Sequence, residues 1–101
     1  MKIKNGVVMT GLQIQMRQVL KQAEYIWSEF GEELVVTAAT DGEHSAGSLH
    51  YYGYAVDLRT HYFSTIQAEQ ITIRLQDKLG NKYTVLFEGD HIHVQYNIHK
   101  L

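Results

Sequence analysis

Histidine and carboxylate side chains are the residues of this sequence best suited to chemistry. The chain contains six histidines and no cysteine. Disulfide frameworks, thiolate metal sites and thiol nucleophiles are therefore excluded. A transition metal, if one is bound, must be held by imidazole nitrogens and carboxylate oxygens. Three of the histidines and three carboxylates fall in two clusters, residues 48–57 and residues 88–95.

The second cluster contains a His-x-His pattern in a segment that alternates polar and apolar residues. Because residues two apart on a β-strand project from the same face, His91, His93 and Gln95 would lie together. The apolar residues between them would enter the core. Taken alone, the pattern also describes a half-exposed strand that carries two ordinary histidines.

The first cluster places His50 and Asp57 seven residues apart. An unbroken strand would separate them by roughly 23 Å, and a helix by about 10 Å. Ligands of one metal must converge, so the chain must bend between them, and Gly53 can adopt the required backbone angles. Asp57 follows apolar residues, and burial of an unpaired carboxylate is costly. A metal ion would remove that cost, and so would an ion pair with Arg59.

Together the two clusters supply two imidazoles and a carboxylate, which leaves one position of a tetrahedral metal open. Such a layout is typical of a catalytic zinc site rather than a structural one. Zinc in such a site lowers the pKa of its bound water to about 7 and polarises a carbonyl group. A neighbouring carboxylate or imidazole must then accept a proton.

The spacing of these residues resembles that of a known family. Residues 48–57 read Ser-x-His-x-x-Gly-x-Ala-x-Asp, and residues 90–93 read Asp-x-x-His. The joint pattern is similar to the D-alanyl-D-alanine carboxypeptidase family of zinc peptidases. That family includes vancomycin-resistance dipeptidases, bacterial cell-wall endopeptidases and phage endolysins, and it is related to lysostaphin-type and hedgehog-like zinc domains. Residues 41–53 resemble the small phage and prophage members in particular, and the resemblance covers most of the chain.

The resemblance implies one Zn²⁺ per chain, with His50, Asp57 and His93 as the metal ligands. It places Asp90 at the position of the general base, and it makes His91 a candidate for stabilising the transition state. Asp90 has the opposite strand parity to both histidines of the pattern, so it faces the metal only if the strand begins after it.

The loop before the first ligand contains further candidate residues. Ser48 matches a small hydroxyl residue of the family, which suits a supporting hydrogen-bond donor. Asp41 and His44 would either shape the pocket or serve as a turn residue and a solvated histidine. Carboxypeptidase members hold the substrate's terminal carboxylate with an upstream arginine, but residues 35–50 contain neither Arg nor Lys. Arg59 could take its place; the departure favours an endopeptidase over a carboxypeptidase.

Two helices and four strands are expected to position these residues. Apolar periodicity predicts helices over 11–30 and 65–79. Residues of capping-box spacing stand at the start of each helix, and a glycine follows its end. They are Thr10, Gln13 and Gly31 for the first helix, and Ser64, Gln67 and Gly80 for the second. Short β-branched or alternating segments predict the strands 34–39, 54–58, 83–87 and 91–96. These elements predict an α+β fold with two helices on a mainly antiparallel sheet of three or four strands and a zinc cleft.

Length and charge restrict the class of protein. The 101 residues allow a single catalytic domain over 1–101, and a net charge of −2 gives no basic field for nucleic acid. No run approaches the roughly 20 apolar residues of a membrane span, and no signal peptide is recognisable. We therefore expect synthesis in the cytoplasm, with access to the cell wall after release through a holin-type membrane lesion.

The leading hypothesis is a zinc-dependent peptidase that cleaves stem or cross-link peptides of peptidoglycan during phage or prophage lysis. The alternative is a catalytically inactive module that keeps the zinc site for binding or as a virion accessory part. A domain without metal is the third interpretation, and it requires the ligand spacing to arise by accident.

Overall fold

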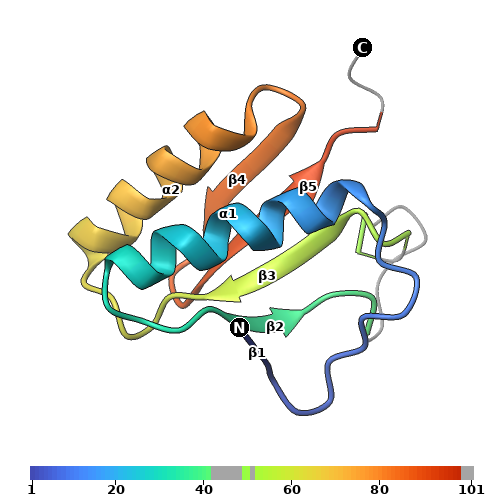
Figure 1. Ribbon diagram of the computed structural model, residues 1–101, viewed down its shortest axis with the longest axis horizontal. Coiled ribbons are helices and arrows are strands. Elements are labelled where there is room, and N and C mark those ends of the chain that lie inside the picture. The colour runs from blue at the N-terminus through green and yellow to red at the C-terminus, as the bar shows by residue number, and fades with distance from the viewer. Residues whose placement is uncertain (42–48, 51, 99–101) are drawn as a thin grey trace.

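The structure is a computed structural model, and it describes residues 1–41, 49–50 and 52–98. The helices are α1 (Gln15–Glu29) and α2 (Thr65–Leu79). The strands are β1 (Lys2–Ile3), β2 (Val35–Ala38), β3 (Ala55–Arg59), β4 (Tyr83–Phe87) and β5 (His91–Tyr96). They form one sheet in the order β1-β2-β3-β5-β4, in which β1 and β2 are parallel and all other neighbours are antiparallel. Both helices cover the same face of this sheet (Figure 1).

The core lies between the helices and the covered face of the sheet. The stripe of α1 is fully buried, as its 3.6-residue spacing predicts: Met16, Val19, Ala23, Ile26 and Trp27. Alternate residues of the strands meet it, among them Val56, Leu58, Ile92 and Val94, all of which are 0% exposed. The Trp27 indole Nε1–H also donates to the Arg59 carbonyl at 3.0 Å and so fixes the end of β3. The opposite sheet face is left free for polar side chains.

The predicted α+β class is confirmed, but the sheet has five strands rather than three or four. The additional strand is β1, whose two residues are exposed and carry no alternating pattern. Lys2 N–H donates to the Leu34 carbonyl at 2.8 Å, and Lys4 N–H donates to the Val36 carbonyl at 2.9 Å. This strand therefore forms through backbone pairing with β2. No local pattern in the sequence predicts that pairing.

The start of α2 and the end of α1 agree with the prediction. Ser64 Oγ accepts from Gln67 N–H, and Gln67 Oε1 accepts from Ser64 N–H, both at 3.1 Å, which is the predicted capping box. At the end of α1, Gly31 has a φ of 79°, Gly31 N–H donates to the Ser28 carbonyl, and Glu32 N–H donates to the Trp27 carbonyl. These two bonds form a Schellman motif, which confirms the predicted helix stop.

The start of α1 differs from the prediction. The helix begins at Gln15 rather than near residue 11, and the expected capping box of Thr10 and Gln13 is wrong, because Ile14 is the N-cap and makes no side-chain cap. Gln13 N–H donates instead to the Gly53 carbonyl at 2.9 Å, and the Thr10 carbonyl accepts from Thr40 Oγ1 at 2.7 Å. Tertiary partners therefore replace the local cap.

These bonds belong to an N-terminal clamp, formed by residues 7–13, that holds the segment leading to the predicted ligand His50. Thr40 N–H donates to the Val8 carbonyl at 2.9 Å, and Gln13 Nε2 donates to the Tyr52 carbonyl at 3.2 Å. The clamp thus contacts the chain both before and after the loop that carries His50.

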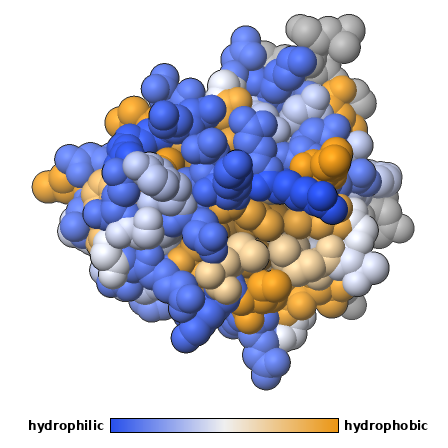
Figure 2. Space-filling model, viewed as in Figure 1, coloured by the Kyte–Doolittle hydropathy of each residue, from blue (hydrophilic) through white to orange (hydrophobic). Residues whose placement is uncertain are grey.

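The helix-bearing face is mostly hydrophilic over α1 and α2, and apolar surface gathers beside α1 toward the N-terminal segment (Figure 2). Met1, Ile3 and Val8 are each close to half exposed in that segment. In the residues that the structure describes, neither helix has the length and apolar character needed to cross a membrane.

Candidate metal centre

The uncovered face of the sheet carries the predicted functional side chains of β3 and β5. Asp57 and His93 are direct cross-strand partners, and so are Arg59 and His91. Their sheet neighbours Leu58 and Ile92 are completely buried on the helix side. The alternation of β5 is therefore confirmed, with its histidines on the open face and its aliphatic residues in the core.

His50 reaches the same place from the loop between β2 and β3. Gly53 N–H donates to the His50 carbonyl at 3.1 Å, and Tyr54 N–H donates to the Leu49 carbonyl at 2.8 Å. Gly53 has a φ of 80°, a conformation that residues with a Cβ rarely adopt. The predicted bend at this glycine is confirmed, and it turns His50 back over the sheet.

Three ligand atoms converge at the open face of the sheet. His50 Nε2 lies 3.2 Å from Asp57 Oδ1 and 3.2 Å from His93 Nδ1, and the last two atoms are 3.0 Å apart. Tetrahedral ligands about 2.0–2.1 Å from zinc lie about 3.3 Å from one another. The three atoms thus have nearly the spacing of one face of a tetrahedron. This His50–Asp57–His93 triad could hold a metal ion.

The three side chains of the triad differ in how far they are buried. The His50 side chain is 8% exposed, whereas Asp57 and His93 are 20% and 16% exposed. His50 Nδ1 lies 2.9 Å from the Ala39 carbonyl, which can only accept a hydrogen bond. Nδ1 must therefore carry the proton, and Nε2 presents a lone pair to the triad when the ring is neutral. A lone pair beside a carboxylate oxygen favours a cation between them.

The pKa values of Asp57 and His93 also indicate that the triad favours a positive charge between its members. Burial alone would raise the pKa of Asp57, but hydrogen bonds with His50 and His93 outweigh burial and hold that pKa well below its usual range. The hydrogen bond with Asp57 raises the pKa of His93, against the opposing effect of burial. A proton can therefore neutralise the cluster, and so can a metal ion.

Asp90 and His91 form a second group next to the triad. Asp90 Oδ1 accepts from His91 Nδ1 at 2.7 Å, and His91 Nε2 lies 3.9 Å from Asp57 Oδ2. The strand begins at His91, after Asp90, as access of Asp90 to the site requires. The Asp90 side chain is 80% exposed, and its carboxylate contacts the ring nitrogen of His91 opposite the one that faces Asp57.

The charge around His91 is negative. Burial alone would lower the pKa of His91, but the hydrogen bond with Asp90 and the charges of Asp57 and Glu88 outweigh burial and raise it. Glu88 Oε1 lies 3.5 Å from His91 Nε2. Glu88 is a further candidate that was not assigned a role from the sequence, although its position three residues before His91 in the same hairpin is a usable signal.

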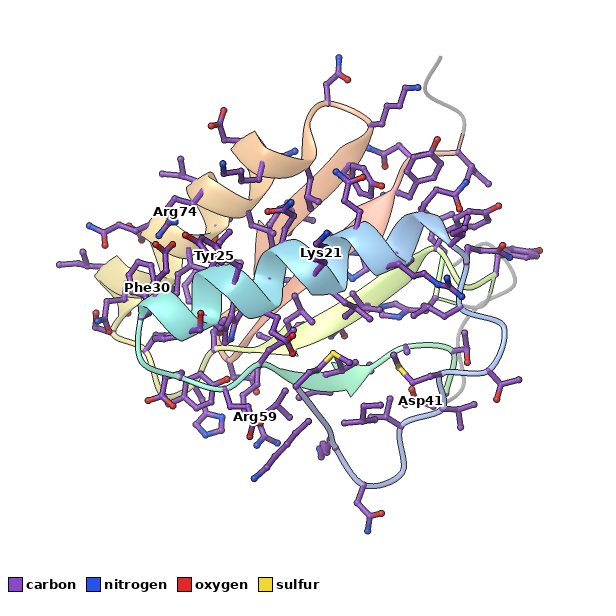
Figure 3. All side chains as sticks on the ribbon, in the orientation of Figure 1. Lys21, Tyr25, Phe30, Asp41, Arg59 and Arg74 are labelled. Atoms are coloured by element: carbon purple, nitrogen blue, oxygen red, sulfur yellow. The ribbon has the colours of Figure 1, made fainter. Side chains whose placement is uncertain are left out.

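A cavity of about 370 Å³ opens beside the triad. Asp57, Arg59, Asp90 and His91 line it, together with Lys4 at the end of β1. Figure 3 shows Arg59 at the end of β3 and Asp41 just beyond the end of its antiparallel neighbour β2, on opposite sides of this strand pair. Arg59 therefore lines the same cavity as Asp57.

The other candidate residues of the sequence, Asp41, Ser48 and His44, belong to the loop that precedes His50. Asp41 Oδ1 accepts from Ala39 N–H at 2.8 Å and from Val8 N–H at 3.2 Å. Asp41 thus ties the end of β2 to the N-terminal clamp, which agrees with the turn role left open by the sequence. Ser48 and His44 lie outside the residues that the structure describes.

Comparison of the sequence with models of protein families gives no match, and neither does comparison with curated proteins. The case for a function therefore depends on the residues and on the geometry of the triad.

Gly53 provides a test of how strictly the loop must position His50. A Cβ at residue 53 would lie 2.1 Å from the Gly11 carbonyl oxygen. We expect Gly53→Ala to lower the free energy of unfolding by about 2 kcal/mol or more and to weaken metal binding, because the loop must move. Urea unfolding and zinc titration measure the two effects.

Gly6→Ala is the matched control for this prediction. Gly6 has a φ of 91°, but a Cβ there would meet nothing within 4 Å. The control isolates the cost of the backbone conformation, about 1 kcal/mol. Equal stability losses in Gly53→Ala and Gly6→Ala would contradict a steric requirement at residue 53.

Proposed function

We propose that this protein is a zinc-dependent peptidase that cleaves stem or cross-link peptides of peptidoglycan, with endopeptidase activity favoured and a role in phage or prophage lysis. The single observation that carries the proposal is the convergence of His50 Nε2, Asp57 Oδ1 and His93 Nδ1 within 3.2 Å of one another. The pattern of residues that resembles zinc peptidases supplies the substrate class.

The types of ligand favour zinc among the common metals. Two imidazole nitrogens and one carboxylate oxygen suit Zn²⁺, whereas Ca²⁺ and Mg²⁺ prefer sites made of oxygen atoms. Three protein ligands leave one position of a tetrahedral ion for water or substrate, as in catalytic sites. The partial exposure of Asp57 and His93 supports access of a substrate from the open face.

Zinc bound to the triad would supply Lewis acidity, which polarises the scissile carbonyl and activates water. The chain's own contribution would be proton transfer by the pair formed by Asp90 and His91. His91 Nε2 is on the side of Asp57, and Asp90 supports the opposite ring nitrogen. A proton taken from the attacking water would pass through this pair to the leaving amine.

The cavity beside the triad suits a substrate with a carboxylate group. Lys4 and Arg59 line it, and within the part of the chain that the structure describes neither forms an ion pair. Peptidoglycan stem peptides carry carboxylates in their side groups as well as at their ends. Arg59 would thus contact an anionic group of the substrate in place of the arginine that residues 35–50 lack.

The second candidate function is a zinc-containing binding or virion accessory module without catalysis. The observation that favours it is the position of Asp90, whose side chain is 80% exposed and bonded to His91 rather than to the triad. A site kept only for attachment would need the metal ligands and no base.

Mass spectrometry of purified peptidoglycan after incubation with the zinc-loaded protein separates the two functions. We expect new stem-peptide fragments, whose masses identify the cleaved bond. His50→Ala is the control, because it lacks a metal ligand and should leave the peptidoglycan unchanged. An unchanged digest with the wild-type, zinc-loaded protein would favour the binding module.

A further inference from the structure

A chain of side-chain hydrogen bonds leads away from the triad along the open face of the sheet. His93 Nε2 lies 2.9 Å from Gln95 Oε1, and Gln95 Nε2 donates to Asn97 Oδ1 at 2.9 Å. Asn97 Nδ2 in turn donates to Thr84 Oγ1 at 2.8 Å. These three bonds connect His93 to the neighbouring strand β4 through side chains that are all partly buried.

The orientation of this chain determines which nitrogen of His93 carries a proton. Because Gln95 Nε2 donates to Asn97, its Oε1 is the atom that faces His93 and can only accept. His93 Nε2 must then carry a proton, so in the neutral ring the lone pair lies on Nδ1, the atom that faces His50 Nε2 and Asp57 Oδ1. The bond also fixes the rotation of the imidazole ring.

The end of this chain is itself held in place. Asn97 N–H donates to the Lys82 carbonyl at 2.7 Å, so the backbone of residue 97 is tied to the start of β4. Thr84 is the cross-strand partner of Gln95. The amide of Asn97 therefore has a fixed neighbour on each side, and it can hold the amide of Gln95 in one orientation.

The two histidines of the triad are supported in different ways. His50 Nδ1 bonds to the backbone carbonyl of Ala39, which no substitution of a side chain removes. His93 depends on the side chain of Gln95. We propose that Gln95, oriented by Asn97 and Thr84, is a positioning residue that makes Nδ1 of His93 the metal-binding atom. This inference rests on the proposed metal-binding function and adds a residue to it.

Gln95→Leu removes the acceptor while keeping a side chain of similar size. Loss of a hydrogen-bond partner of a ligating histidine weakens metal binding by about 10- to 100-fold, and we expect a loss in that range. Gln95→Glu retains an acceptor for His93 Nε2–H, since Asn97 can turn its amide toward the new carboxylate while Thr84 donates its hydroxyl proton. We expect this variant to recover most of the lost affinity.

Zinc affinity is measured by competition with a chromophoric chelator for the wild type, Gln95→Leu and Gln95→Glu. ¹⁵N NMR of the zinc-loaded wild type reports whether His93 Nε2 is protonated. Circular dichroism and thermal unfolding of the metal-free variants confirm that each one is folded. The expected results are protonated Nε2, weak binding by Gln95→Leu, and recovery in Gln95→Glu.

Each other outcome decides one of the two proposals. If the wild type binds zinc and Gln95→Leu binds it equally well, the role of Gln95 is wrong and the metal site stands. Protonated Nδ1 of His93 in the zinc-loaded protein, or no recovery in a folded Gln95→Glu, also overturns the role of Gln95. If the wild type binds no zinc, the proposed metal site fails, and the inference about Gln95 fails with it.

Discussion

Replacing His50 with alanine is expected to lower the zinc content from about one ion per chain to nearly none. Binding of zinc to sites with four ligands releases about 10–16 kcal/mol, so one ligand contributes about 3 kcal/mol or more, equivalent to about a 100- to 1,000-fold change in Kd. His50 is also the most buried residue of the triad. Water cannot easily replace its imidazole, since the His50 side chain is only 8% exposed.

Elemental analysis of the purified protein and a chelator competition assay measure this loss. Asp57→Ala should give the same result, because Asp57 Oδ1 is close to both histidine nitrogens of the triad. His61→Ala is the matched control: His61 lines the neighbouring cavity but is not among the ligand atoms that converge. A His50→Ala protein that still contains one tightly bound zinc would show that the triad is not the metal site.

Replacing Asp90 with alanine is expected to leave the zinc content unchanged and to reduce peptidase activity by about 10²- to 10⁴-fold, the range typical of a lost acid–base group. Metal binding should persist because the Asp90 carboxylate bonds to His91 and is not part of the triad. The measurement is the rate of release of stem-peptide fragments by zinc-loaded protein. A fully active Asp90→Ala protein would rule out a role for this carboxylate in the reaction.

His91→Ala and the double variant show whether Asp90 acts alone or through its neighbour. The 2.7 Å bond between Asp90 and His91 places the imidazole on the side nearer to Asp57. If the two residues transfer the proton as one unit, the double variant will be about as slow as either single variant. Multiplied losses in the double variant would instead indicate independent roles, with Asp90 as the base and His91 as a separate stabilising group.

Elements with a local signal could be predicted from the sequence. The capping box at Ser64 and Gln67 predicted the start of α2, and Gly80 predicted its end. The alternation of residues 91–96 predicted β5 and its buried face. Strand β1 could not be predicted, because its two residues carry no alternating pattern and pair with residues more than thirty positions away. The start of α1 was misplaced for the same reason, since Gln13 bonds to Gly53 rather than capping the helix.

The metal ligands could be predicted from the sequence, whereas the groups that hydrogen-bond to them could not. His50, Asp57 and His93 can be recognised in the sequence because their joint spacing resembles that of a zinc peptidase family. Gln95 could be placed on their face by strand parity, but its bond to His93 depends on the orientation of an amide. The partner of His50 Nδ1 is the backbone carbonyl of Ala39, which no side chain indicates, so this bond could not be predicted from the sequence.

The N-terminal clamp has a consequence for the order in which the molecule assembles. Its bonds to Thr40, Asp41 and Tyr52 join residues 30–39 positions apart in the chain. Contacts of such separation require closure of long loops, and they form late when local helices and hairpins can form first. The hairpin of β4 and β5 would present His93 early, whereas His50 arrives only when the first and middle thirds of the chain meet. Metal capture would therefore be a late event of folding, because His50 joins Asp57 and His93 only after these long-range contacts have formed.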